Sequence, residues 1–173
     1  MDAADATVSE RLALIASDRS LASVDARAED LADPDVREVV IRADHPELDR
    51  ALRDGRDEIK VKVNGEPVSV RLHLQMHQVL ATQLADDDPP EVFVTAQRLL
   101  AAGYERHEVL HMLTAPIAEQ IFATLSDGEP YDRARHIAEL QALPGSWERQ
   151  RGQRSLKRTD PKGRHAARRR RDA

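Results

Sequence analysis

Prolines that follow helix-capping side chains divide this chain into short helices. Asp33 precedes Pro34, and Asp88 precedes Pro89, so each pair offers a capping carboxylate and then a proline. Proline is favoured at the first position of a helix because its missing N–H would have no helical partner there. A third restart occurs at Pro46. Apolar residues recur with a helical period after each of these points, so the sequence predicts a mainly helical fold.

The composition supports this fold class. Aromatic residues make up 3% of the chain and charged residues 33%, which favours helices packed through Ala, Leu and Val over an aromatic-rich sandwich. The absence of cysteine excludes disulfides and thiolate metal sites. No apolar run approaches the roughly 20 residues needed to cross a bilayer. The first residues also lack the pattern of a secretion signal. We therefore expect a cytoplasmic protein with no membrane contact.

One segment changes from a helical period to a period of two. Valines and an isoleucine alternate with lysines before Asn64-Gly65, which is a strong signal for a two-residue hairpin turn. A turn at that place would pair Val61 with Val68 and Ile59 with Val70, so that apolar residues face each other across the ladder. The sequence therefore predicts a small helical bundle that carries one β-hairpin.

Charge and periodicity predict three regions along the chain. These are a helical N-terminal extension over residues 1–45, a helical core domain over 46–147 with the hairpin at 58–72, and a disordered basic tail over 148–173. The tail has a charge balance of +8, whereas the rest of the chain has −13. A segment with so few apolar residues does not bury enough surface to fold. Its positive charge could bind nucleic acid or an acidic partner, or it could serve only for solubility.

Two pairs of histidines carry most of the chemical signal. His73 and His77 form one pair (H-L-Q-M-H), and His107 and His111 form the other (H-E-V-L-H). A spacing of four residues places each pair on one helix face, with Cβ atoms roughly 6 Å apart. Two imidazoles at this spacing can chelate one metal ion. If the two helices lie side by side, all four histidines could hold one ion, and zinc or iron suits such a nitrogen set.

A carboxylate is expected near such a site. Four neutral imidazoles leave the double positive charge of the ion uncompensated in a medium of low dielectric constant. Glu108 and Glu119 are the candidates, either as ligands or as partners that orient the ligands. The predicted metal site therefore consists of His73, His77, His107, His111, Glu108 and Glu119.

Two other interpretations of the histidines stay open. H-E-V-L-H also matches the zinc-peptidase pattern, with Glu108 as general base, but its place at the expected start of a helix argues against a hydrolase. Alternatively, the histidines are hydrogen-bonded core residues, and the chain is a non-enzymatic interaction protein with a polyanion-binding tail. His45 precedes a proline, which biases its backbone away from the helical region, so we interpret it as a junction residue and not as a ligand.

The chain also contains a long and specific string, H-L-Q-M-H-Q-V-L-A-T-Q-L-A-D-D-D-P-P-E-V, followed by L-L-A-A-G-Y-E-R-H-E-V-L-H-M-L. This string resembles the core of a bacterial family named domain of unknown function 1841. The resemblance covers about residues 45–147, from a His-Pro-Glu opening to a Leu-Pro-Gly-Ser-Trp ending. The family carries no established activity, so the resemblance implies a helical fold and a shared set of histidines.

Three positions depart from the pattern of that family. The family usually has Asn-Pro where this chain has Ser69-Val70, and Asp where it has Glu105, which is a poorer helix cap. Pro116 is also unusual, and a proline inside a helix predicts a kink or an early end.

Overall fold

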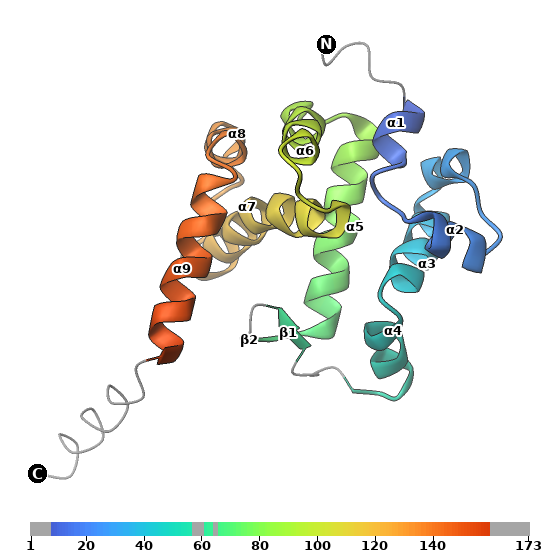
Figure 1. Ribbon diagram of the computed structural model, residues 1–173, viewed down its shortest axis with the longest axis horizontal. Coiled ribbons are helices and arrows are strands. Elements are labelled where there is room, and N and C mark those ends of the chain that lie inside the picture. The colour runs from blue at the N-terminus through green and yellow to red at the C-terminus, as the bar shows by residue number, and fades with distance from the viewer. Residues whose placement is uncertain (1–7, 57–60, 64–65, 160–173) are drawn as a thin grey trace, which may run out of the picture. The chain divides into compact units, whose positions relative to one another are not determined.

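The computed structural model describes residues 8–56, 61–63 and 66–159, and this part of the chain is mainly helical (Figure 1). The helices of the N-terminal part are α1 (Val8–Leu12), α2 (Asp18–Ser23), the 3-10 helix η2 (Ala28–Ala32), α3 (Pro34–Asp44) and α4 (Pro46–Arg53). The strands β1 (Val61–Val63) and β2 (Glu66–Val68) come next. They are followed by α5 (Val70–Asp86), α6 (Glu91–Ala101), α7 (Arg106–Asp127), α8 (Arg133–Gln141) and α9 (Gly145–Thr159).

The chain divides into two compact units between Leu143 and Pro144. Helix α5 is central to the first unit, because it contacts α1, α3, α4, α6 and α7 (Figure 1). The second unit contains α9. No helix among the described residues is long and apolar enough to span a membrane.

The core of the first unit lies where α5, α6 and α7 meet. Leu80 and Leu84 of α5, Leu99 of α6 and Leu113 of α7 are each 0–1% exposed. Along α5 the buried positions recur at helical spacing, and His77 precedes Leu80 and Leu84 on the same buried side. The apolar stripe that stabilises α5 therefore also turns a histidine toward the interior.

Side-chain caps fix the starts of several helices. The carboxylate of Asp33 accepts a hydrogen bond from the backbone N–H of Asp35 at 2.8 Å, and Pro34 occupies the first helical position, which confirms the predicted start of α3. Asp132 likewise accepts from the backbone N–H of Arg135 at the start of α8. Caps of this kind satisfy N–H groups that have no partner within the helix.

The strands form a short antiparallel ladder in which Val61 lies opposite Val68. The prediction of a hairpin reaching residue 72 is wrong at its C-terminal end, because Val70 is the first residue of α5 and cannot pair with Ile59. The cause is Ser69, whose hydroxyl accepts from the backbone N–H of Leu72 and so begins the helix. Ile59 and the turn at residues 64–65 lie outside the described residues.

The connection between α5 and α6 also differs from the prediction. Helix α6 begins at Glu91 with Pro90 as its N-cap, two residues later than the sequence predicted. Asp87 ends α5 in a left-handed conformation, and the carboxylate of Asp88 forms an ion pair with Arg133 at the start of α8. Asp88 therefore links the connection between α5 and α6 to the start of α8, and it does not cap α6.

Pro116 does not end α7, which continues through it to Asp127. A proline inside a helix costs about 3 kcal/mol because it removes one backbone hydrogen bond and crowds the preceding turn. Buried apolar residues lie on both sides of it, among them Leu113 and Ile117, and their packing offsets that cost. The prediction of an early end is therefore wrong.

The predicted disordered tail is wrong for residues 148–159, which belong to α9. This segment lacks an apolar stripe, but Arg, Gln, Lys and Leu are all favourable helix formers. Residues 160–173 lie outside the described residues, and binding of a polyanion by this region stays a prediction.

Candidate metal centre

Five histidines from three separate segments meet beside α5. His73 and His77 come from α5, His107 and His111 come from the first two turns of α7, and His45 joins α3 to α4. The structure thus brings together both predicted pairs, because α5 and α7 pack against each other. It adds a fifth histidine that sequence reasoning placed outside the site.

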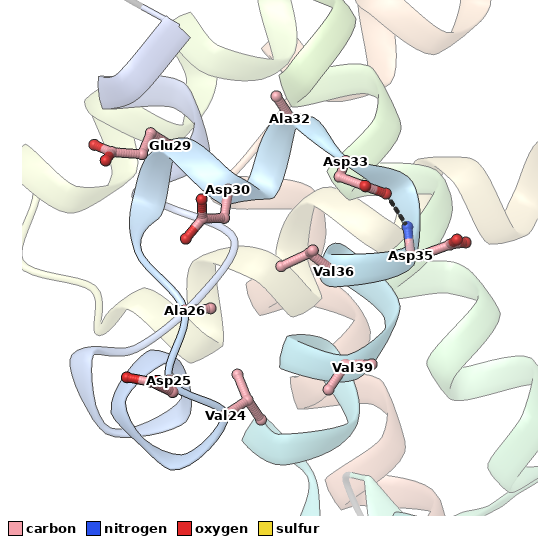
Figure 2. Close-up of a pocket in the computed structure, with 10 residues that line it drawn as sticks. All are labelled: Val24, Asp25, Ala26, Glu29, Asp30, Ala32, Asp33, Asp35, Val36 and Val39. Carbon is pink, nitrogen blue, oxygen red and sulfur yellow. Dashed lines mark hydrogen bonds between the residues drawn. The ribbon is translucent and has the colours of Figure 1, made fainter.

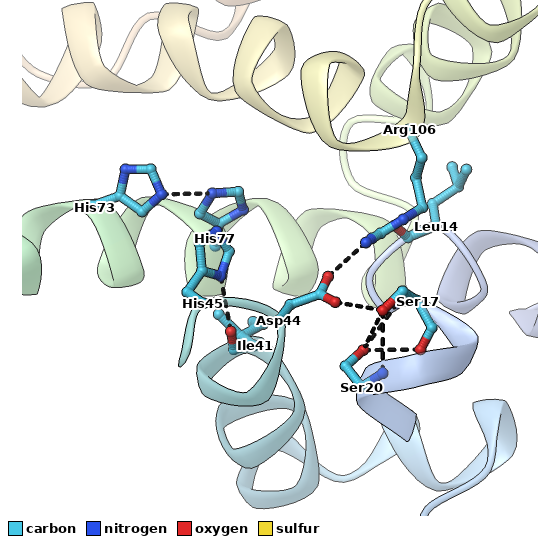
Figure 3. Close-up of polar contacts among 9 residues, drawn as sticks. All are labelled: Leu14, Ser17, Ser20, Ile41, Asp44, His45, His73, His77 and Arg106. Atoms are coloured by element: carbon cyan, nitrogen blue, oxygen red, sulfur yellow. Dashed lines mark hydrogen bonds and ion pairs between the residues drawn. The ribbon is translucent and has the colours of Figure 1, made fainter. Parts of the chain in front are cut away.

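The pair on α5 has the geometry of two ligands on one ion. The Nε2 atoms of His73 and His77 are 3.2 Å apart, and His77 is only 4% exposed (Figure 3). Two imidazole nitrogens bound at 2.0–2.1 Å in a tetrahedral arrangement lie about 3.3–3.4 Å apart. Without an ion, one of these nitrogens donates its hydrogen to the other.

His45 is oriented by its own helix. Its Nδ1–H donates to the carbonyl oxygen of Ile41 at 2.9 Å, because a carbonyl only accepts (Figure 3). Its Nε2 therefore carries a lone pair, and this buried atom has no hydrogen-bond partner. The His45 ring lies 4.5 Å from the His77 ring and 5.0 Å from the His73 ring, measured between centroids. His45 is a junction residue, as expected, and it also faces the cluster.

His111 completes a group of four converging nitrogens. Its buried Nε2 has no hydrogen-bond partner, and one nitrogen from each of His45, His73, His77 and His111 lies within 4.8 Å of the others. His107 is outside this group of four but adjoins it, with its ring 4.4 Å from that of His111 and 5.0 Å from that of His45. The side chains of His45, His73, His77 and His111 are called the inner group below.

Burial keeps His73, His77 and His111 uncharged at neutral pH. It lowers the pKa of His73 to about 4 and that of His111 to about 3, with neighbouring histidines adding to the effect. The pKa of His77 is lowered further, also chiefly by burial. A neutral imidazole offers a free lone pair, so these side chains need not lose a proton before they bind an ion.

Two carboxylates that the sequence did not single out, Asp44 and Glu47, also act on a histidine of the cluster. Burial lowers the pKa of His107, and His45 and Arg106 lower it further, while the carboxylates of Asp44 and Glu47 only partly oppose this shift. Glu108 occupies the third position of α7, as predicted. Glu119 is exposed and lies near enough to Arg135 of α8 to raise its pKa. Neither glutamate is part of the inner group.

An ion pair holds the segments around the cluster together. Arg106 Nη2 donates to Asp44 at 2.6 Å, and Arg106 Nη1 donates to the carbonyl oxygen of Leu14 at 3.1 Å. The other carboxylate oxygen of Asp44 accepts from the Ser17 hydroxyl at 2.6 Å (Figure 3). These bonds tie the start of α7 to the end of α3, which are the segments that carry His107 and His45.

A groove in the described part of the first unit lies apart from the histidines. It has a volume of about 550 Å³ and is formed by residues 24–39, with an apolar floor that includes Val36 and Val39 and carboxylates such as Asp25 and Asp35 around it (Figure 2). No histidine of the cluster lines it. The groove and the histidines are therefore separate features.

A signal for His45 was present in the sequence but not in its periodicity. No second histidine lies three or four residues from it, so the spacing rule that found the two pairs does not apply. The His-Pro-Glu opening, which was part of the resemblance, does contain His45. A search for histidines shared within a family, and not for spacing alone, would have included it.

Comparison with curated proteins and with solved structures gave no match. The sequence profile of the domain of unknown function family DUF1841 matches residues 24–142, which is more than half of the chain. The match begins before the predicted core domain and covers α3, α4 and all five clustered histidines. This chain therefore belongs to the DUF1841 family.

Proposed function

We propose that this domain binds one divalent transition-metal ion, with the imidazoles of the inner group as its ligands. The observation that supports this most directly is that two buried ring nitrogens, His45 Nε2 and His111 Nε2, have no hydrogen-bond partner. Leaving such a polar atom buried and unpaired costs about 1–3 kcal/mol, whereas a metal ion among the four nitrogens would satisfy both atoms at once.

The donor atoms indicate the class of metal. A set of neutral imidazoles without thiolates suits zinc, iron, nickel or copper, and it disfavours magnesium and calcium, which prefer oxygen ligands. The hydrogen bond from His45 Nδ1 to the Ile41 carbonyl has the form that commonly orients metal-binding histidines. It leaves Nε2 of His45 as the ligand atom.

Charge compensation would come from nearby carboxylates. Asp44 and Glu47 are close enough to His107 to oppose the lowering of its pKa by burial, so they would also stabilise a positive ion in the cluster. Glu108 lies one residue after His107 and is a further candidate to orient a ligand. Glu119 lies near Arg135, so the negative charge of Glu119 interacts with that guanidinium group.

The alternative function is a non-enzymatic interaction domain with structural histidines. The His73–His77 contact favours it in one respect, because two imidazoles can hydrogen-bond to each other without any metal. This alternative leaves the nitrogens of His45 and His111 unsatisfied. It also predicts that added metal has no effect on stability.

Metal content and stability separate these two functions. Untagged protein purified without a chelator should contain close to one equivalent of a transition metal by mass spectrometry. Metal at a hundred times its dissociation constant should stabilise the fold by about 2.7 kcal/mol. Less than about a tenth of an equivalent, together with no stabilisation by added zinc, iron, nickel or copper, would contradict the proposal. A His77→Ala variant serves as the control, because it should lose the added stability.

A further inference from the structure

The five histidines are arranged in order of depth below the surface. His45 and His77 are 3% and 4% exposed, whereas His107 is exposed and the other two histidines are intermediate. An ion arriving from solvent therefore meets His107 first and reaches His45 and His77 last. The order of burial defines a direction of approach.

His107 is placed to connect solvent with the inner group. Its ring lies 4.4 Å from the ring of His111, one helical turn away on α7, and 5.0 Å from that of His45. It also stacks on His77 at 5.9 Å, although its nitrogens are not part of the inner group. A pair at this spacing on one helix can chelate an ion at the surface before the deeper nitrogens engage it.

Two carboxylates near His107, one of them exposed, attract an approaching cation. Glu47 is exposed on the first turn of α4, and Asp44 is largely buried. The negative charges of both carboxylates interact favourably with a positive charge at His107. Arg106 opposes them, but its guanidinium is paired with Asp44 and with the carbonyl oxygen of Leu14. An exposed carboxylate beside a cation site raises the local concentration of cations and their association rate.

Building on the metal site proposed above, we infer that His107 is its uptake ligand. His107 first binds an incoming divalent transition-metal ion together with His111. The ion then moves inward to the four nitrogens of the inner group. His107 thus governs the rate of loading, whereas the inner group sets the affinity.

The test compares the rate of loading with the affinity in the full chain, using Co²⁺ because its visible absorption reports nitrogen coordination. After chelator treatment, Co²⁺ is mixed in a stopped-flow instrument with the wild-type protein or with His107→Ala. The variant should take up Co²⁺ about tenfold more slowly, while its equilibrium dissociation constant changes by less than about threefold. Because His107 is exposed, its removal leaves the core intact, which circular dichroism verifies.

Two further variants make the result specific. Glu47→Gln should slow uptake by a few-fold at low ionic strength and much less at high ionic strength, since screening weakens the attraction. His165→Ala removes one imidazole from outside the described residues and should load at the wild-type rate. Equal slowing by His165→Ala would overturn the role of His107.

Three other results also oppose this inference, and they are distinguishable. If His107→Ala takes up and releases Co²⁺ at the wild-type rates, the role in uptake is wrong and the metal site stands. If uptake is unchanged and release becomes faster, His107 is an ordinary fifth ligand. If the wild-type protein gives no Co²⁺ spectrum at all, the proposed function itself fails.

Discussion

Asp44 and Arg106 form a 2.6 Å ion pair, and each lies one residue before a histidine of the cluster. The Asp44 side chain is 8% exposed and that of Arg106 is 26% exposed, so solvent screens this pair only partly. The pair therefore determines how close the end of α3 lies to the start of α7. The distance between His45 and His107 depends on a contact that involves no histidine.

Replacing Arg106 with Met should destabilise the fold by about 2–3 kcal/mol, because it leaves the buried Asp44 carboxylate with the Ser17 hydroxyl but without its cation. Ser17→Ala removes the neutral partner of Asp44 and also the N-cap of α2, so it should cost about 1–2 kcal/mol. Urea unfolding of the two variants measures both values. A loss below about 0.5 kcal/mol for Arg106→Met would show that the pair does not hold the two segments together.

Substitutions should separate the ligand set drawn from the structure from the set predicted from the sequence. His45→Ala should weaken metal binding at least about a hundredfold, because it removes an oriented nitrogen from the inner group. Glu119→Gln, on the exposed side of α7, should leave the affinity unchanged. Isothermal titration with zinc compares the two variants. The reverse ranking would favour the set that contains Glu119.

Pro116→Ala should stabilise the protein. Alanine restores a backbone N–H inside α7 and relieves a cost of about 3 kcal/mol. It also removes buried side-chain carbon, which costs about 0.8 kcal/mol for each methylene group. The expected net gain is about 1–2 kcal/mol in the free energy of unfolding, measured in urea. A net loss would mean that the packing of the proline ring outweighs its effect on the backbone.

His136 should contribute to acid sensitivity. It is completely buried in α8, and burial, assisted by Arg133, lowers its pKa below the usual 6.5. The unfolded chain therefore binds the proton first, so this contribution to stability is present above pH 6.5 and is lost as the pH falls below it.

The matching variant is His136→Leu, since neither ring nitrogen of His136 has a hydrogen-bond partner that would be lost. Between pH 7.5 and 5.5 the wild-type protein should lose up to about 1.4 kcal/mol more stability than this variant. Urea unfolding at the two pH values gives the difference. Equal losses would mean that His136 takes up its proton as readily in the folded protein as in the unfolded chain.

Features set by neighbouring residues were largely predictable. Interactions within a few residues determine the cap at Asp33 and the start of α7 near Glu105. They also place the two histidines of each pair on the same face of their helix. Features that depend on distant contacts were not. Asp88 resembled a cap, but Arg133, 45 residues later in the chain, forms an ion pair with it.

The same reasoning explains the wrong early end at Pro116 and the omission of His45 from the cluster. A local rule predicts that proline ends a helix, and only packing from other helices shows that α7 continues. His45 is close to His77 because α3 and α5 pack together, and no residue spacing around His45 reports that contact. The part of the site that was missed is therefore the part created by tertiary structure.

The spread of the inner group along the chain has a consequence for unfolding. His45 and His73, and likewise His77 and His111, are separated by roughly thirty residues, so one bound ion would close two loops. A permanent cross-link around a loop of that length removes entropy worth about 3–4 kcal/mol from the unfolded chain. While all four imidazoles hold the ion, α5 cannot part from α7 or from the α3–α4 junction. Release of the metal ion would then limit the rate of unfolding.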